Sequence, residues 1–277
     1  MTIEQALLLR SVLIVVAHPD DETIGAGGLL PRLPGLRIVH LTDGAPRDPA
    51  DTLAAGFDRR EDYAAARRRE LISAMRLAGV EPWQLTSVNV VDQEASLEMA
   101  YLTLKLVDVI RKGRPGVILT HPYEGGHPDH DAAAFAVHAA CVRVEAPPEV
   151  YEFTSYHAAA QVSMAGQASG GAAGGAGLRM ETGRFLAGTD QGEAVALDQA
   201  ALARKREMFE CFSTQRRMLQ HFHVDEERFR PSPAYDFTTA PHPGPLLYES
   251  FGWTLTGERW RLLAQEALKT LGAANPI

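Results

Sequence analysis

The sequence predicts an α/β protein built on a mostly parallel sheet. Three observations support this prediction: short apolar, β-branched runs alternate with helical patterns, most of these runs are apolar throughout, and turn residues separate the segments. Continuously apolar strands are buried on both faces, as in a parallel sheet covered by helices. With 277 residues, 45% of them hydrophobic, the chain is long enough for one large domain.

The expected elements follow in alternating order. The first strand, 11–17, reads SVLIVVA and is followed at once by charged residues. Further strands are expected at 37–41, 86–91, 116–120 and 149–153. Helices are expected at 62–78, 97–111, 129–144, 197–219 and 256–271, from apolar positions that recur on one face. Residues 220–250 show no clear period, so we expect irregular structure there.

The chain is expected to form a single domain over 1–277. An α/β core would occupy 1–180, and an extension over 181–277 would complete the fold. The Gly- and Ala-rich stretch 158–178 is expected to be a surface loop, either a tolerated insertion or a lid.

Composition narrows the class of protein. A formal net charge of −8 argues against nucleic acid as the main partner, because phosphate binding favours a basic face. Two cysteines do not make a disulfide framework, and the N-terminus lacks the pattern of a secretory signal. No apolar run approaches the length of a membrane span. We therefore expect a cytoplasmic protein without a membrane span, and the oligomeric state stays open.

Two polar clusters follow predicted strands. HPDDE follows the strand at 11–17, and HPYEGGHPDHD begins where the strand at 116–120 ends. The carboxyl ends of parallel strands share one edge of a sheet, and ligands bind beyond that edge. The sequence therefore predicts a site that contains both clusters.

The residue types in these clusters favour a catalytic metal. His18 and Asp21, three residues apart in a tight turn, and one histidine of the pair His127 and His130 would supply three ligands. Imidazole and carboxylate suit Zn²⁺, and three protein ligands leave one position for water. Asp20, adjacent to a ligand, is the candidate general base.

The remaining histidine would donate a proton or stabilise an oxyanion, and Asp129 would orient an imidazole. A simpler reading is that each cluster caps a helix N-terminus. The occurrence of both clusters after apolar strands favours the metal site.

The ordered pair of motifs, AHPDDE and HPDH, resembles the LmbE-like / PIG-L deacetylase family over at least 11–145. This resemblance implies a Rossmann-like, three-layer α/β/α fold and hydrolysis of the N-acetyl group of N-acetylglucosaminyl compounds. It implies one Zn²⁺ per chain, which other divalent metals can replace, on His18, Asp21 and His130. It also implies Asp20 as the base and His127 as the electrophilic or acid partner, held by Asp129.

The resemblance also implies substrate-binding residues. Arg67, in the helix that reads RRREL, would contact the substrate, although a solvent-exposed helix face is an alternative. Asp92 would bind a sugar hydroxyl, and Asp43 is a weaker candidate. Some members carry a tyrosine two residues before the second motif, as an oxyanion or acid group. Gly125 stands there in this chain and Tyr123 is the nearest tyrosine, so the identity of the general acid stays open.

The expected substrate is a small amino-sugar compound. Two alternatives remain open: an amidase that acts on a larger amide, of the thiol-conjugate type, and a non-catalytic domain that binds a metal or a sugar. A free base beside three ligands argues against the second alternative. Among the C-terminal aromatic residues Tyr235, Tyr248 and Trp253, core packing is expected for most, and a sugar-stacking role is the alternative.

Overall fold

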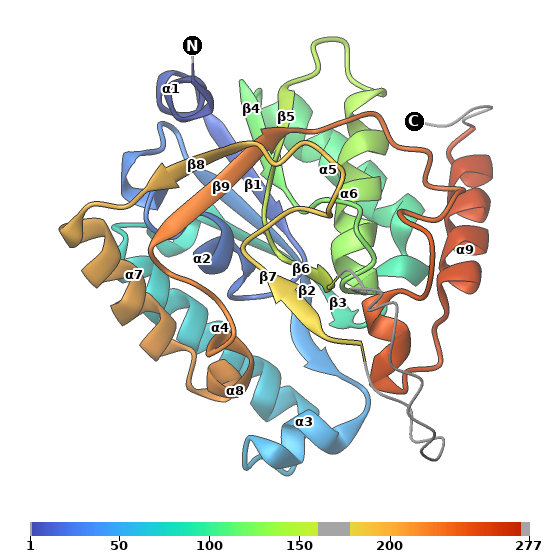
Figure 1. Cartoon of the computed structure of the whole chain (residues 1–277), viewed down its shortest axis with the longest axis horizontal. Helices are drawn as coiled ribbons and strands as arrows, with labels where there is room; N and C mark the ends of the chain where they lie inside the picture. Colours follow the sequence, from blue (N-terminus) through green and yellow to red (C-terminus); the bar gives the residue numbers. More distant parts are fainter. Residues whose placement is uncertain (1, 160–177, 273–277) are drawn as a thin grey trace, which may run out of the picture.

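A seven-stranded sheet forms the centre of the protein in this computed structural model, which describes residues 2–159 and 178–272 (Figure 1). The strand order is β3-β2-β1-β4-β5-β9-β8. The first five strands are parallel. β9 is antiparallel to β5, and β8 is antiparallel to β9, so β8 has the same direction as the first five strands. The predicted class, an α/β fold with a mostly parallel sheet, is confirmed.

The strands are β1 (Val12–Val16), β2 (Arg37–Pro46), β3 (Leu85–Asp92), β4 (Val117–Thr120), β5 (Glu149–Phe153), β8 (Glu193–Ala196) and β9 (Glu226–Pro231). A separate pair consists of β6 (Tyr156–Ala158) and β7 (Met180–Thr182). The helices are α1 (Ile3–Leu9), α2 (Asp21–Ala26), α3 (Pro49–Ala54), α4 (Arg60–Leu77), α5 (Met99–Gly113), α6 (Pro128–Cys141), α7 (Gln199–Cys211), α8 (Arg216–Leu219) and α9 (Gly257–Thr270). All five strands predicted from the sequence are present.

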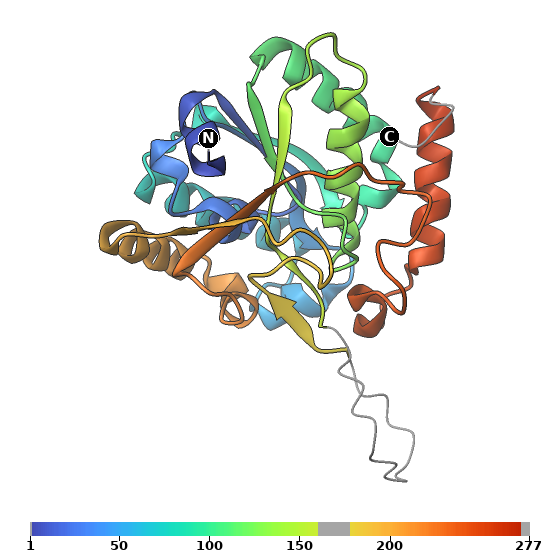
Figure 2. The same cartoon turned by 45° about the horizontal axis from the view of Figure 1, so that its top comes forward.

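Helices cover both faces of the sheet, which makes three layers (Figures 1 and 2). Alternate residues of β1 point to opposite faces: Ile14 belongs to one core and Val15 to the other. The first core is closed by α1, α2, α4 and α7, and the second by α5, α6 and α9. Because every residue of β1 is buried, its sequence has no polar alternation.

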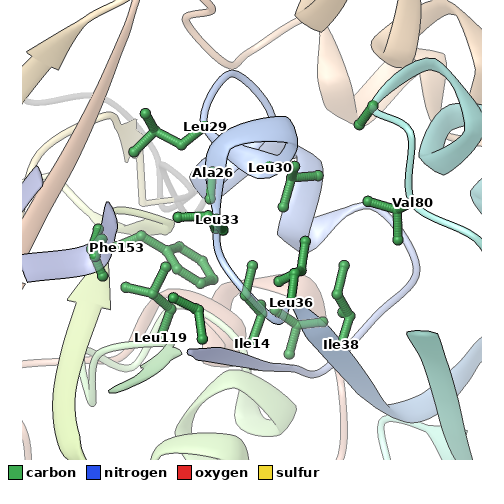
Figure 3. Packing of buried hydrophobic residues seen from close by; sticks show 14 of the residues in the cluster. Ile14, Ala26, Leu29, Leu30, Leu33, Leu36, Ile38, Val80, Leu119 and Phe153 are labelled. Carbon is green, nitrogen blue, oxygen red and sulfur yellow. The ribbon is translucent and has the colours of Figure 1, made fainter. Parts of the chain in front are cut away.

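The first core shows how the parallel strands are covered. Figure 3 shows Ile14, Ile38 and Leu119, from three neighbouring strands, pointing toward Leu30 and Leu33 of the segment after α2. Phe153 of β5 lies at the side of the same cluster. This packing fixes the turn between β1 and α2, which carries the first polar cluster.

The C-terminal part differs from the prediction in two places. The helix expected over 197–219 ends at Cys211, and a 3-10 turn (Ser213–Gln215) separates it from α8. Glu70 of α4 holds that turn, since its carboxylate accepts hydrogen bonds from Ser213 and Thr214. This contact with a distant helix outweighs the local preference to continue α7.

The second difference is β9, which lies within the region expected to be irregular. Its buried positions include Glu227 and Arg230 as well as Phe229, so the strand lacks an apolar pattern. Glu227 pairs with Lys205 at 2.7 Å and Arg230 with Glu152 at 2.7 Å. Because these buried residues are charged and paired, the strand could not be predicted from a pattern of apolar residues.

The two polar clusters meet at the carboxyl edge of the sheet, as predicted, because β1 and β4 are adjacent and parallel. The expected loop over 158–178 lies almost entirely outside the described residues. The division into a 1–180 core and a 181–277 extension stays a prediction, although β8 and β9 join the same sheet as β1. Among the described helices, none combines the length and the apolar character that crossing a membrane requires.

Candidate metal and catalytic site

A cleft of about 1270 Å³ opens at the carboxyl edge of the sheet. Seven residues predicted for the site line it: His18, Asp20, Asp21, Arg67, Asp92, His127 and His130. They come from the turn after β1, from α4, from the end of β3 and from the start of α6. The sequence thus identified side chains that the fold brings together from four separate segments.

The turn after β1 has an unusual backbone at Asp20. Its φ is 138°, a conformation that residues with a Cβ rarely adopt, so the surrounding structure must hold it. The backbone N–H of Asp20 donates to Oε2 of Glu22 at 3.2 Å, and the same oxygen lies 2.9 Å from Nε2 of His40 on β2. The fourth acidic or basic side chain of HPDDE, Glu22, therefore ties the turn to the sheet and does not face the cleft.

The three predicted metal ligands lie at nearly equal distances from one another. Nδ1 of His18 is 3.2 Å from Oδ2 of Asp21, and Nε2 of His130 is 3.2 Å from Oδ1 of Asp21. The two imidazole nitrogens are 3.3 Å apart. The two imidazoles face different oxygens of Asp21. Each spacing is close to the roughly 3.3 Å between ligand atoms around tetrahedral Zn²⁺ with ligand distances of about 2.0–2.1 Å, which favours this donor set for the ion.

The second nitrogen of each ligand histidine faces a hydrogen-bond acceptor. Nε2 of His18 lies 3.1 Å from Asp92 and 3.4 Å from Asp129, and Nδ1 of His130 lies 3.1 Å from Oγ of Ser155. These partners favour protonation of the outer nitrogen and leave the inner lone pair for a metal.

Groups that could hold an ion overlap in this cluster. In the part of the chain that the structure describes, three sets of three side chains lie close enough together to hold an ion. They are the set His18, His127 and His130, the set Asp21, His121 and His130, and the set His18, Asp92 and Asp129. His121 stacks on His130 with ring centroids 3.9 Å apart, and its Nε2 lies 3.2 Å from Asp21 and 3.2 Å from the backbone N–H of Ala17. All the members are buried, so the cluster is an interior polar site that opens only into the cleft.

Asp20 is the carboxylate next to the three predicted ligands that is not itself a predicted ligand. Its Oδ2 lies 3.3 Å from Nη2 of Arg67, which also donates to the carbonyl of Pro19 at 2.8 Å. Burial raises the pKa of Asp20 to about 8, against the opposing effect of Arg67. A cation bound nearby would lower it again. An acid in this environment can accept and return a proton near neutral pH.

Arg67 is buried, with 3% of its surface exposed, so the alternative of a solvent-exposed helix face is wrong. Nη1 donates to the carbonyl of Gly44 at 2.9 Å, and together with the bond to Pro19 this links the turns after β1 and in β2. Arg67 is therefore a positioning group for Asp20. Glu70, its partner in the motif, binds the 3-10 turn after α7 instead.

The predicted link between Asp129 and His127 takes a different form. The Asp129 carboxylate does not hold the imidazole of His127; it accepts from the N–H groups of Gln93 at 2.7 Å and Ala95 at 3.1 Å and faces His18. The backbone N–H of Asp129 donates to Nδ1 of His127 at 3.1 Å, as an N-cap bond of α6. The capped nitrogen needs its lone pair, so neutral His127 carries its proton on Nε2.

Two predicted substrate-binding residues lie elsewhere. The hydroxyl of Tyr123 donates to the carbonyl of Thr239 at 2.8 Å, and its ring packs in the second core against Trp260, with centroids 5.2 Å apart. Asp43 accepts from Arg60 at 2.6 Å and from the N–H of Ala45, and it does not line the cleft. Both side chains have partners outside the cleft, so a role of either in substrate binding stays a prediction.

The sequence reasoning missed Ser155 and Tyr156. They follow β5 after one intervening residue, Thr154. The carboxyl end of β5 falls at the same edge as those of β1 and β4, and that position is the signal that could have found them. Trp253 also lines the cleft, with its ring 5.0 Å from that of His127. Tyr235 and Tyr248 pack in the interior, as expected for most of these aromatic residues.

Comparisons with known proteins agree with this geometry. Residues 13–141 match the family model described as PIG-L, GlcNAc-PI de-N-acetylase. The diacetylchitobiose deacetylase of Thermococcus kodakarensis is 33% identical over 135 residues, which cover 46% of this chain and 47% of that protein. The chain spans about half the length of the curated relatives that it matches.

Solved structures share the fold at low identity. The A40926 pseudoaglycone deacetylase is 18% identical with a TM-score of 0.55, over 81% of this chain and 99% of that one. The 4-carboxy-2-hydroxymuconate hydratase of Pseudomonas putida is also 18% identical, with a TM-score of 0.50, over 77% of this chain and 82% of that one. Because a deacetylase and a hydratase both share this fold, the activity must be argued from the side chains of the site.

Proposed function

Residues 13–141 carry the PIG-L (LmbE-like) family sequence, and from this premise we propose that the protein is a zinc-dependent N-deacetylase of N-acetylglucosaminyl compounds. One observation carries the proposal: a three-ligand set, His18, Asp21 and His130, shares a cleft with a carboxylate, Asp20, that is free to act as a base. We expect one Zn²⁺ per chain, replaceable by other divalent metals.

When bound, Zn²⁺ would lower the pKa of a water molecule and polarise the amide carbonyl. The chain's own groups would then move the protons. Asp20 accepts a proton from the water that adds to the carbonyl carbon, and it passes that proton to the nitrogen as the C–N bond breaks. The products are acetate and a free amine. Arg67 holds Asp20 in place throughout.

His127 fits the role of an electrophile better than that of a general acid. Its Nδ1 accepts the N-cap hydrogen bond, so the proton on Nε2 is the only one the neutral ring carries. Loss of that proton would leave an imidazolate, which is too basic to form near neutral pH. We therefore assign His127 as a hydrogen-bond donor to the oxyanion and Asp20 as the source of the proton for the amine.

The size of the cleft bears on the substrate. About 1270 Å³ is more than the roughly 300–1,000 Å³ of ordinary small-molecule sites. We infer that the substrate is an amino-sugar compound with a substantial aglycone, which would extend toward the wall formed by the turn at Ser213–Gln215 and by α8. Asp92, at the floor of the cleft, remains a candidate for a sugar hydroxyl.

The same volume also favours the second candidate, an amidase on a larger amide of the thiol-conjugate type. The two differ in the acid released, since only a deacetylase yields acetate. A non-catalytic metal- or sugar-binding domain has no need of Asp20 in a strained turn beside the ligands. A cytoplasmic location stays a prediction.

The test is acetate release from N-acetylglucosamine and diacetylchitobiose by the purified protein, as isolated, after chelation and after addition of Zn²⁺. Release that chelation abolishes and Zn²⁺ restores supports the deacetylase. Bound zinc without acetate release, but with hydrolysis of larger amides, supports the amidase. If the protein neither binds zinc nor releases acetate, the proposal is wrong.

A further inference from the structure

Tyr156, the first residue of β6, places a hydroxyl in the cleft that the proposed mechanism has not used. The side chain lines the cleft together with Asp20, His127 and His130, and the residue is 8% exposed. Among the described residues the Tyr156 hydroxyl has no hydrogen-bond partner. By contrast, the hydroxyl of Tyr63, which lines the same cleft, accepts from Gln215 at 2.8 Å.

The ring of Tyr156 is held on two sides. It lies edge-on against His130, with centroids 5.1 Å apart and planes at 66°, and against Phe222, with centroids 5.9 Å apart. Its backbone pairs with Thr182 of β7. The preceding residue, Ser155, contacts Nδ1 of His130. The segment Ser155–Tyr156 therefore contacts a metal ligand through both of its side chains and has little freedom to turn away.

The loop that carries His127 is built to let this segment approach. A Cβ placed on Gly126 would lie 1.8 Å from the carbonyl oxygen of Tyr156 and 3.4 Å from its ring, so only glycine fits there. Gly126 immediately precedes His127 in the chain. Tyr156 and His127 thus reach the cleft from two segments in direct backbone contact.

Hydrogen-bond donors are scarce at the centre of the cleft. The carboxylates of Asp20, Asp21 and Asp92 accept only, and the ligand histidines direct their N–H groups outward to Asp92, Asp129 and Ser155. The terminal nitrogens of Arg67 are committed to Gly44, Pro19 and Asp20. Among the described residues next to the predicted metal ligands, the Nε2–H of His127 and the hydroxyl of Tyr156 are donors without a partner.

We propose that the Tyr156 hydroxyl donates a hydrogen bond to the acyl oxygen of the substrate as that oxygen becomes an oxyanion, which makes Tyr156 a second donor beside His127. The inference rests on the proposed deacetylase function. A neutral, rigidly held phenol suits this role because it adds no charge to the site and needs no reorganisation when negative charge develops.

The experiment compares wild type with Tyr156→Phe, which keeps the ring and removes only the hydroxyl. We expect kcat for acetate release to fall about 10²-fold with KM little changed, because the bond forms mainly in the transition state. Affinity for a tetrahedral methylphosphonamidate analogue of the N-acetyl group, measured by calorimetry, should fall as well. Affinity for the free amine product and zinc content should stay as in wild type.

Tyr151→Phe is the matched control, because that hydroxyl bonds to Glu149 on β5, away from the cleft. It should match wild type in kcat and in affinity for the analogue. The inference would be overturned if Tyr156→Phe kept wild-type kcat and wild-type affinity for the analogue. It would also be overturned if lost zinc or lowered stability fully explained the fall in kcat. A wild-type protein that binds zinc yet releases no acetate would instead refute the proposed deacetylase, and the role of Tyr156 would fall with it.

Discussion

Two clusters of buried charged side chains in this protein differ in how their charges are balanced. The cleft cluster consists of Asp20, Asp21, Asp92, Asp129 and Arg67, and all five residues are buried. The second cluster, called the Arg230 cluster, consists of Glu124, Glu152 and Arg230, which are also buried. Each contains a single arginine, but the number of carboxylates that the arginine must balance is different.

In the Arg230 cluster the arginine lies between its two carboxylate partners. Arg230 donates to Glu152 at 2.7 Å through Nε and to Glu124 at 3.3 Å through Nη2. Burial raises the pKa of Glu124 and of Glu152 to about 7, against the opposing effect of Arg230. One bound proton therefore suffices to bring this cluster to neutrality.

In the cleft cluster four carboxylates face one guanidinium. Bound protons offset part of this excess, because burial raises the pKa of Asp20 to about 8 and, against the effect of burial, the charges of Asp92 and Asp21 raise the pKa of His18. Buried charge of this size requires compensation. The Arg230 cluster therefore needs one proton for neutrality, whereas the cleft cluster has a larger excess of carboxylates, which the proposed metal ion would also offset.

The largest expected effect comes from Asp20→Asn. The amide keeps the size of the side chain and an acceptor for Arg67, but it cannot take a proton from water. We expect turnover to fall by about 10²–10⁴-fold while zinc stays bound. Measurement of kcat and metal content on the same preparation tests this, and a variant with the full rate would show that the role assigned to Asp20 is wrong.

The next largest effect is expected from Arg230→Met in the Arg230 cluster. Removing the arginine leaves two buried carboxylates without their partner, and we expect the free energy of unfolding to fall by about 3–5 kcal/mol. Urea unfolding at pH 7 measures it. An unchanged urea midpoint would mean that Arg230 does not balance the two carboxylates. The difference in charge balance between this cluster and the cleft cluster would then not hold.

Glu124→Gln is the matched control for that variant, because it removes one carboxylate and keeps the acceptor for Leu186 N–H. In the wild-type protein Glu124 and Glu152 hold their protons in the folded state up to about pH 7, whereas their ordinary pKa is 4.5. The folded state thus binds more protons between these values, so their contribution to stability is full below about pH 4.5 and is lost as the pH rises through 7. The control should weaken this dependence.

A smaller effect is expected from Asp129→Asn. The carboxylate uses both oxygens as acceptors, for Gln93 and Ala95, and one of them also faces His18. An amide offers only one acceptor oxygen, so the imidazole of His18 loses part of its support. We expect zinc affinity to fall about 10–100-fold. Competition with a chromophoric chelator measures the affinity, and an unchanged value would exclude this role.

The smallest effect is expected from Asp43→Asn, outside both clusters. Asp43 pairs with Arg60 and does not line the cleft. Kinetic constants for the substrate should stay at wild-type values, and stability should change by no more than about 1 kcal/mol. A raised KM would restore the substrate role that the sequence suggested for this residue.

Local sequence was sufficient for much of the site. His18, Asp20 and Asp21 lie in one turn, so their proximity follows from the chain itself, and His130 follows from the adjacency of β1 and β4. Family resemblance added Arg67 and Asp92, which both line the cleft. By contrast, Tyr123 was proposed as the tyrosine nearest to the second motif and Asp43 from its position at a strand end. Neither criterion fixes the direction of a side chain, and both pair outside the cleft.

Partners that are distant in the chain could not be inferred in the same way. Asp129 contacts His18, 111 residues away, and not its neighbour His127 through its carboxylate. Tyr156 lies so close to Gly126 that a side chain at Gly126 would clash with its carbonyl oxygen. The strand β9 was missed because its buried residues include charged ones whose partners lie on other elements.

The sequence by itself determined the alternation of strands and helices, the two motifs and the chemistry that their side chains can perform. These depend on interactions between residues close along the chain and on the burial of continuous apolar runs. Only the tertiary structure decided which carboxylate supports which imidazole, which arginine balances which acid and which hydroxyl enters the cleft. Those choices depend on distances between segments far apart in sequence, and such distances are set by packing of the whole core.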